Sequence, residues 1–217
     1  MESNSGAVKN SSGARDERRS SSHEVADAEE STRLRLLLEA SISVFARFGY
    51  RKTSMEEVAR AAGFSRQGVY FYYSTKEALF RGTILYVYES RLKEAGNVLA
   101  DRSLSLRERL GKALDAWYGR YIGTVQAAAS DLVESSGLHA AEIVKTFEER
   151  LDAMLVRALS AEKELTRAYR SVKVHPAQIA RVLHATAQGL KDTCQRREDF
   201  IDGMNAAAAL ICAYPSA

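Results

Sequence analysis

The sequence is poor in cysteine and proline, and both shortages narrow what the chain can be. Among 217 residues there are two cysteines, Cys194 and Cys212, and two prolines. The cysteines have neither the spacing of a zinc site nor a Cys-x-x-Cys motif, so we predict no metal site and two reduced, buried thiols. A disulfide between them fits the count but is unusual in the cytosol. Few prolines, few consecutive β-branched residues and abundant Ala, Leu, Glu and Arg favour an all-α protein.

Long apolar runs are also missing. No stretch approaches the roughly 20 apolar residues that cross a bilayer, and the Ser-rich, polar N-terminus has no apolar signal core. We therefore expect no membrane association and a cytoplasmic location. Hydrophobic residues make up 46% of the chain, which is enough for a core in one large or two small domains. Residues 1–30 hold almost no large apolar side chain, so we expect a disordered polar arm there.

The residue patterns of enzymes do not stand out either. The sequence shows no pair of carboxylates at a useful spacing, no His-Glu-x-x-His and no glycine-rich phosphate loop. No order of Ser, His and Asp suggests a catalytic triad. We predict that the chain is not an enzyme and that it requires no cofactor.

What the chain does have is an uneven distribution of charge. The net charge is only +3, but residues 31–76 carry eight Lys/Arg against three Asp/Glu, whereas residues 77–217 carry nineteen against eighteen. A short basic segment is often just a solvated surface. Here it coincides with a structural motif, which favours contact with phosphates.

That motif is a helix-turn-helix at about residues 54–73. Met55, Val58, Ala59 and Ala62 recur at helical spacing and predict one apolar face. Gly63 then ends the helix, because the turn needs a backbone angle that glycine adopts at little cost. Ser65 is placed to cap a second helix, whose inward face would hold two side chains four residues apart, Val69 and Tyr73.

The rest of the second helix carries side chains that a short helix cannot all bury. Arginine and glutamine match the hydrogen-bonding edges of bases, and three consecutive aromatic residues follow closely. One alternative is a helical hairpin whose aromatics pack under a neighbouring domain. We favour a helix that reads DNA, with its outward residues at Arg66, Gln67, Tyr70, Phe71 and Tyr72.

Two flanking helices would complete this domain. Residues 31–48 carry an apolar stripe from Leu34 to Phe48 and should end at Gly49. A further helix should begin at Lys76 and run to about Ala95. The helix dipole disfavours a cation in the first turn, so we predict that Lys76 binds a DNA phosphate. Because this helix continues beyond the DNA-binding block, it could transmit movement to the rest of the protein.

The block from about residue 34 to 80 resembles the DNA-binding domain of the tetracycline-repressor (TetR) family. The resemblance rests on Phe45–Tyr50, Thr53–Ala59, Ala62–Ser65, Val69–Tyr73 and Ser74–Leu79. It implies that the helix after Ser65 reads the major groove, with Arg66 and Gln67 on bases and Gly68 allowing close backbone approach. It also implies phosphate contacts by Tyr70, Tyr72, Lys76 and Thr53, with Ser54 and Ser65 completing the DNA-binding set. Phe71 and Tyr73 depart from the usual pattern, and Phe71 could contact a thymine methyl group.

The remainder of the chain reads as a second helical domain. We predict helices over about 104–123, 125–135, 138–160, 176–194 and 197–214, with a loop at 161–174. The resemblance implies an effector pocket, which we assign to Trp117, Tyr121, Phe147 and Met154; a plain aromatic core is the alternative. It also implies dimerisation through 176–214, unless these helices only close the monomer core. We assign that interface to Leu183, Leu190, Phe200, Met204, Ala207 and Ile211.

The sequence thus predicts an all-α protein in three parts: a polar arm (1–30), a three-helix DNA-binding domain (31–78) and a helical effector-binding and dimerisation domain (79–217). Its partners would be double-stranded DNA with a palindromic operator, a second copy of itself and an apolar or aromatic small molecule. The predicted function is a homodimeric repressor released by that molecule. The alternatives are an enzyme with an all-helical pocket and a DNA-binding nucleoid or division factor without an effector.

Overall fold

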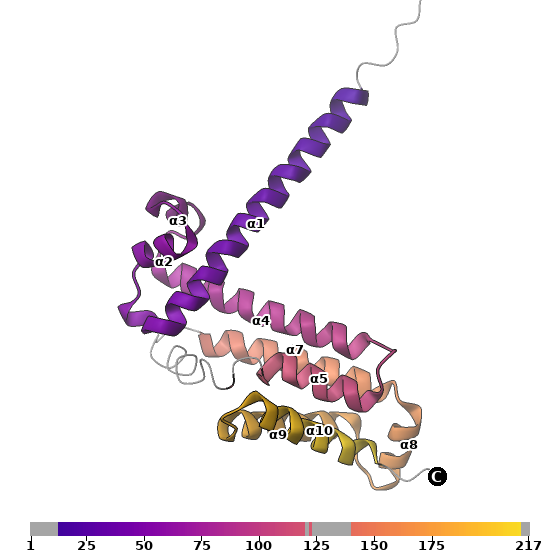
Figure 1. Ribbon diagram of the computed structural model, residues 1–217. Helices are drawn as coiled ribbons and strands as arrows, with labels where there is room; N and C mark the ends of the chain where they lie inside the picture. Colours follow the sequence, from indigo (N-terminus) through magenta and orange to yellow (C-terminus); the bar gives the residue numbers. More distant parts are fainter. Residues whose placement is uncertain (1–12, 120–121, 123–139, 214–217) are drawn as a thin grey trace, which may run out of the picture.

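The computed structural model describes residues 13–119, 122 and 140–213, and within these ranges every regular element is a helix (Figure 1). The predicted all-α class is confirmed. No helix in these ranges combines the length and apolarity that a bilayer crossing needs. The helices in chain order are α1 (Gly13–Lys52), α2 (Met55–Ala62), α3 (Arg66–Tyr72), α4 (Lys76–Ala100), α5 (Leu106–Tyr118), α7 (Ala140–Ser160), α8 (Lys163–Ser171), α9 (Pro176–Thr193) and α10 (Arg197–Cys212).

Helix α4 joins two hydrophobic cores. Its first turns bury Leu79 and Phe80 in a core with α1, α2 and α3. Its later turns bury Leu92 and Leu99 in a larger core built with α5, α7, α9 and α10. Figure 1 shows the consequence: α2 and α3 lie beside α1 at one end of α4, α5 and α7 pack along the rest of it, and α9 and α10 lie on the other side of α5 and α7. We call these parts the head and the body.

Helix α1 is longer than the sequence predicts. It begins at Gly13, so the part of the expected arm from residue 13 to 30 is helical rather than disordered. The physical reason is local, because residues 14–48 contain no proline or glycine to interrupt helical hydrogen bonds. Gly49, with φ 76° and ψ 161°, breaks the helix at the predicted place and leaves only a short turn to Lys52.

Two helices of the body also differ from prediction. Helix α4 continues to Ala100, past the expected end near Ala95. Residues 163–171 form α8, where a loop was expected from their polarity. A single helical face explains α8, because Leu165 is completely buried and the Tyr169 hydroxyl donates to the carbonyl oxygen of Ile211, 2.9 Å away. The helix predicted at 125–135 lies outside the described residues.

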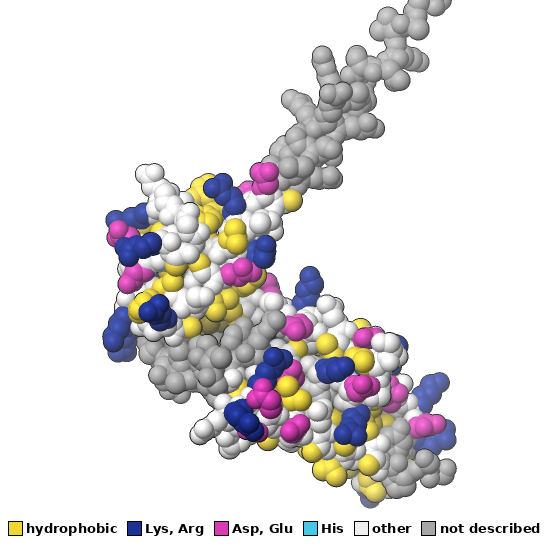
Figure 2. Space-filling model, in the orientation of Figure 1, with side chains coloured by type: hydrophobic (Ala, Val, Ile, Leu, Met, Phe, Trp, Pro, Cys, Tyr) yellow, Lys and Arg dark blue, Asp and Glu magenta, His cyan; other side chains and the backbone are white. Residues whose placement is uncertain are grey.

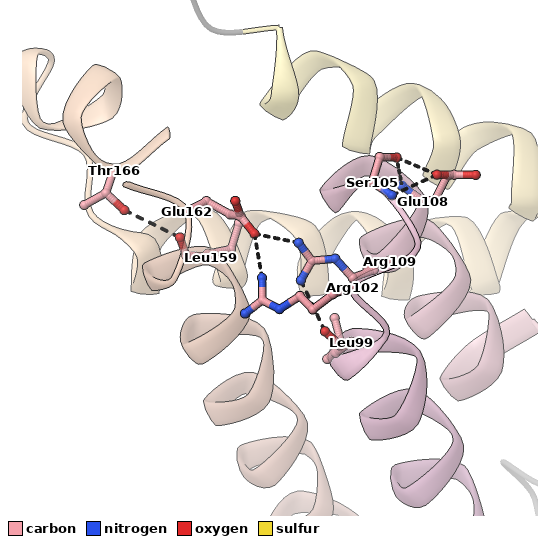
Figure 3. A network of polar contacts seen from close by, with 8 residues as sticks. All are labelled: Leu99, Arg102, Ser105, Glu108, Arg109, Leu159, Glu162 and Thr166. Atoms are coloured by element: carbon pink, nitrogen blue, oxygen red, sulfur yellow. Dashed lines mark hydrogen bonds and ion pairs between the residues drawn. The ribbon is translucent and has the colours of Figure 1, made fainter. Parts of the chain in front are cut away.

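A buried arginine ties the far end of the body together (Figure 3). Arg109 of α5 donates to the carbonyl oxygen of Leu99 at 3.2 Å and to the carboxylate of Glu162 at 2.5 Å. Arg102 reaches the same carboxylate oxygen at 3.0 Å. The network joins the end of α4 to the corner between α7 and α8. It therefore holds the C-terminal end of α4 against the body.

Candidate nucleic-acid interface

Capping residues shape the two short helices of the head: Gly63 and Ser65 act as the sequence predicts, whereas the cap at Ser54 was not predicted. Ser54 begins α2 with a reciprocal cap: its hydroxyl accepts from the Glu57 N–H at 3.2 Å, and the Glu57 carboxylate accepts from the Ser54 N–H at 2.7 Å. The Ser54 N–H and the Ser54 hydroxyl both donate to the Glu57 carboxylate, and they lower the pKa of that carboxyl. Gly63 closes α2 in the left-handed conformation, with φ 70°. Ser65 then begins α3 by accepting from the Gly68 N–H at 3.0 Å.

The inward side of α3 fixes its position in the head. Val69 is completely buried, in one core with Val58 of α2 and Phe45 of α1. Tyr73, at the C-terminal end of α3, packs over Gly82 of α4, where any Cβ would come within 2.6 Å of its ring. Burial raises the pKa of the Tyr73 hydroxyl. Gly82 gave no sign of this contact in the sequence, because it depends on how α4 crosses α3.

The outward side of α3 presents the predicted base-reading residues. Arg66 and Gln67 are exposed in its first turn, and the Arg66 guanidinium lies 5.7 Å from the centre of the Tyr70 ring. Tyr70 is 40% exposed and Phe71 is 76% exposed. Tyr72 is half-buried between the rings of Phe64 and Phe71. Arg66, Gln67, Tyr70 and Phe71 are thus available to a partner, whereas Tyr72 is partly committed to the head.

Gly68 has a structural role that the sequence did not indicate. A Cβ at this position would lie 3.2 Å from the Ser65 hydroxyl oxygen and 3.4 Å from the Phe64 ring. Glycine therefore leaves room for the cap that starts α3. This explains Gly68 without requiring a close approach of DNA to the backbone.

Thr53 and Lys76 occupy different places from those expected of phosphate contacts. Thr53 is 3% exposed, and its hydroxyl donates to the Gly49 carbonyl oxygen at 2.8 Å. The Lys76 ammonium donates to the carbonyl oxygens of Tyr50, Arg51 and Thr53. Both side chains bond within the head, at the end of α1, and their contact with phosphate stays a prediction. The sequence could not reveal this, because it separates Lys76 from its acceptors by more than twenty residues.

Several exposed cations lie on the head. Arg33 of α1 lies over the Phe64 ring, 5.8 Å from its centre, next to the start of α3. Arg51, Lys52 and Arg60 are also exposed. In the space-filling view, Lys and Arg side chains border the head around an area of hydrophobic and uncharged side chains (Figure 2). Arg33 was not predicted as part of this surface. It is recognised only in the structure, where α1 brings it over Phe64.

Comparison with known proteins agrees with this geometry. The family model described as bacterial regulatory proteins, tetR family, matches residues 37–83. Residues 37–83 are thus a DNA-binding domain of the TetR type. The relatives of the chain include the uncharacterised regulator YfiR of Bacillus subtilis, 48% identical over 48 residues, and YhgD of the same organism, 32% identical over 84 residues. The matches span 23% and 44% of those two proteins.

Solved structures extend the likeness in fold to the body. A TetR transcription regulator from Haloarcula marismortui matches with a TM-score of 0.65 and 16% identity, over 85% of this chain and 98% of that one. A transcriptional regulator from Rhodococcus sp. matches with a TM-score of 0.62 and 21% identity, over 82% and 95%. The arrangement of a helix-turn-helix head on a helical body is thus the TetR-family fold, and the family is a class of regulators rather than enzymes.

The residues predicted to line an effector pocket form part of a packed aromatic cluster. Tyr88 of α4 lies between Trp117 and Phe147, with ring centres 5.5 and 5.8 Å away. Trp117 and Phe147 are 1% and 3% exposed. Met154 lies two turns farther along α7, against Gly96 of α4. Tyr121 lies outside the described residues. The structure therefore brings Trp117 and Phe147 together and places Met154 farther along the same helix contact.

A hydrogen-bonded chain lies beside this aromatic cluster. The Tyr118 hydroxyl is 2.5 Å from Nε2 of His184, and Nδ1 of His184 is 2.5 Å from the Asp152 carboxylate. It links α5, α9 and α7 in the body. Burial, with the nearby Glu148 carboxylate, raises the pKa of the Tyr118 hydroxyl. These hydrogen bonds of Tyr118, His184 and Asp152 were not predicted. The one hint in the sequence was the histidine next to the apolar stripe of α9.

The residues predicted to form a dimer interface point into the core of the body. Leu183, Phe200 and Met204 are completely buried within one chain. Leu190, Ala207 and Ile211 are half-buried and pack against the same core. Their assignment to a contact with a second copy stays a prediction. Their burial within one chain fits the alternative left open by the sequence, that these helices close the monomer core.

The outward sides of α9 and α10 carry different apolar and small residues. Val182 is 59% exposed and Leu210 is 77% exposed. Exposed small residues follow at helical spacing, with Ala185 and Gly189 on α9 and Ala206 on α10. We call this set the outer face. Cys194 and Cys212 are free and half-buried at the ends of the same helices, and burial raises the pKa of the Cys212 thiol.

Proposed function

We propose that this TetR-family regulator is a homodimeric repressor that binds a palindromic operator and is released by an apolar or aromatic small molecule. The observation that carries the proposal is the outward side of α3. There an arginine, a glutamine and two aromatic rings are exposed at one end of a basic head, while the opposite side of α3 is locked into the core.

Specificity in this proposal comes from the first turn of α3. Arg66 and Gln67 have forked groups that can pair with guanine and adenine edges in the major groove. Phe71 has no hydrogen-bonding group, so its contact would be apolar, as with a thymine methyl. Tyr70 and the exposed Arg33, Arg51 and Lys52 would supply contacts to phosphate or sugar, which fix the register of the helix without reading sequence.

Dimerisation is supported by the outer face of α9 and α10. Large exposed apolar side chains beside small ones are unusual on a solvated helix and typical of close helix packing. One recognition helix reads few base pairs, whereas a two-fold pair reads an inverted repeat. We therefore assign the contact with a second copy to Val182, Ala185, Gly189, Ala206 and Leu210.

Release by a small molecule would use the contact between α4 and the body. Tyr88 of α4 joins Trp117 and Phe147, so a ligand that inserts among these rings would displace α4, the helix that continues into the head. Such a ligand changes DNA binding only if it binds the displaced state more tightly. Aromatic walls beside the Tyr118 hydroxyl suit an apolar or aromatic molecule.

Selection of duplexes from a randomised DNA pool by the wild-type protein tests the proposal. We expect enrichment of one inverted repeat at physiological salt. Recovery of random sequence would contradict specific regulation and would favour the nucleoid-type alternative. A thermal-shift screen of apolar compounds then tests the effector, because a ligand of the native state raises the unfolding temperature. Specific DNA binding with no stabilising compound would contradict release by a small molecule.

A further inference from the structure

The outward side of α3 holds an arginine over an aromatic ring. The guanidinium carbon of Arg66 lies 5.7 Å from the centre of the Tyr70 ring. The two residues are four positions apart, the spacing at which side chains on one helix meet. A guanidinium within about 6 Å of a ring centre is attracted to the negative face of the ring. Tyr70 therefore gives Arg66 a defined place on the surface of the free protein.

The composition of α3 makes this ring the main partner that the helix offers Arg66. The segment Arg66–Tyr72 contains no aspartate or glutamate, so Arg66 has no ion pair within its own helix. A cation–π contact also leaves the hydrogen bonds of the arginine unused. The five N–H donors lie in the plane of the guanidinium, so a ring on its face can leave them open to a base.

The Tyr70 ring is itself restrained by the head. Tyr70 is 40% exposed, whereas the neighbouring Phe71 is 76% exposed. More than half of Tyr70 is thus covered by the protein. Its backbone is also fixed, because the preceding residue, Val69, is completely buried and Ser65 caps the helix. A restrained ring can restrain the cation that lies over it.

Orienting Arg66 before DNA arrives has a physical advantage. A long, exposed arginine loses much rotamer freedom when it pairs with a base. A side chain that already has the bound orientation loses less, and its affinity rises accordingly. Both N–H donors of the fork must meet guanine O6 and N7 together. Orientation therefore favours guanine over bases that offer a different pattern.

We infer that Tyr70 is a positioning residue for Arg66, and that its ring sharpens the preference for the base pair that Arg66 reads. The inference rests on the proposed function, since it concerns how α3 reads its operator. It separates two parts of one side chain. The ring acts on sequence preference through Arg66, and the hydroxyl stays available to a phosphate, a contact that reads no sequence.

Binding to duplexes altered at single base pairs tests the role of the ring. The probe is the duplex that the wild-type protein selects, and Arg66→Ala identifies the base pair that Arg66 reads. Tyr70→Leu should reduce the preference at this base pair by about two- to fivefold, the factor that an exposed cation–π contact provides. Tyr70→Phe keeps the ring and should keep the preference, whatever uniform loss of affinity follows from removing the hydroxyl.

Phe71→Leu is the matched control, because it removes a ring from the same helix that does not lie under Arg66. It should keep the preference at the base pair that Arg66 reads. Circular dichroism establishes that each variant is folded. An unchanged preference in Tyr70→Leu would overturn the inference, and so would an equal loss in Tyr70→Phe. A loss confined to another base pair would mean that Tyr70 reads a base itself, which also contradicts it.

A double-mutant cycle tests whether the ring acts through Arg66. When residue 66 is already alanine, the cost of Tyr70→Leu for the selected duplex should shrink by the same factor of about two to five. An equal cost in both backgrounds would show that the two side chains contribute independently.

A measurement without DNA keeps the inference separate from the proposed function. The face of an aromatic ring shifts the proton resonances of a group that lies over it. Tyr70→Leu should move the δ-methylene signals of Arg66 toward those of an exposed arginine such as Arg107, whereas Tyr70→Phe should leave them in place. If the wild-type protein selects no sequence, the proposed function fails, but these signals still test the contact. Signals that stay in place in Tyr70→Leu would show that the ring does not hold Arg66.

Discussion

At the scale of single residues, the head divides its polar side chains between folding and recognition. Ser54, Ser65 and Thr53 all use their hydroxyl groups on backbone atoms of the head. Arg66 and Gln67 are exposed on α3, and the contact that the structure gives Arg66 is the face of Tyr70. The residues with the greatest freedom to meet a base are therefore those in the first turn of α3.

Replacing Arg66 tests that division. Arg66→Ala should weaken binding to the selected duplex by about 1–3 kcal/mol and relax preference at one base pair in each half-site. The measurement is a titration against duplexes that carry each substitution. Arg107→Ala removes the same charge from an exposed site on α5 and serves as the control. Equal losses in the two variants would mean that Arg66 contributes only charge.

The cap at the start of α2 predicts a pH dependence. Hydrogen bonds from the Ser54 backbone and hydroxyl lower the pKa of Glu57. The cap therefore contributes stability above the unfolded pKa of this carboxyl, and loses it as the pH falls through the lower folded value. In Ser54→Ala, a carbon-13 titration should show the pKa of Glu57 rising toward its ordinary value. Glu108, which has the same arrangement with Ser105, should not change, and an unmoved Glu57 would contradict the assignment.

What sequence could predict at this scale depended on distance along the chain. The cap at Ser65 and the break at Gly63 are local, so residue type and spacing were sufficient to predict them. The bonds of Lys76 and Thr53 within the head could not be predicted, because the carbonyls that accept them belong to the end of α1, whose geometry follows the break at Gly49. The sequence analysis explained Gly68 by a close approach of DNA to the backbone. In the structure, the nearest atom to a Cβ at this position is the Ser65 hydroxyl oxygen, which caps α3.

At the scale of helices, the Tyr118–His184–Asp152 chain holds three elements of the body together. His184 is 7% exposed, and each of its ring nitrogens has a partner from a different helix. A buried polar group that loses its partner costs more than the bond itself contributes. The chain should therefore fix how α5, α7 and α9 meet beside the aromatic cluster.

Removing one hydroxyl measures this contribution. Tyr118→Phe leaves Nε2 of His184 without that partner and should lower the free energy of unfolding by about 1–3 kcal/mol. Urea unfolding gives the value. Tyr86→Phe removes a comparable bond to Glu39 at an exposed site and should cost less than about 1 kcal/mol. Similar costs for the two variants would show that the buried chain is no stronger than a surface contact.

Helix existence was easier to predict than helix orientation. The stripes of α5, α7, α9 and α10 were all found, because 3.6-residue periodicity survives in the sequence. Helix α8 was missed because most of its residues are polar and Leu165 is its one buried residue. On α9 and α10 both the stripe and the small-residue side are apolar, and only packing against α5 decides that Leu183 and Met204 turn inward.

At the scale of the whole molecule, the outer face predicts the state of assembly. Val182→Glu and Leu210→Glu place charges in the proposed contact, and each change occurs twice in a two-fold dimer. Both variants should sediment as monomers at concentrations where the wild type is a dimer. Val172→Glu changes a side chain that is 65% exposed at the end of α8, away from this face, and should remain dimeric. Unaltered dimers in the first two variants would place the interface elsewhere.

The central claim is that two copies of α3 read the two halves of one site. Hydroxyl-radical footprinting on the duplex selected by the wild-type protein tests it most directly. The account predicts two equal protected half-sites, related by two-fold symmetry and separated by about one helical turn or a multiple of it. It also predicts that Arg66→Ala weakens both halves to the same degree. A single or unsymmetrical footprint, or one that Arg66→Ala leaves intact, would contradict it.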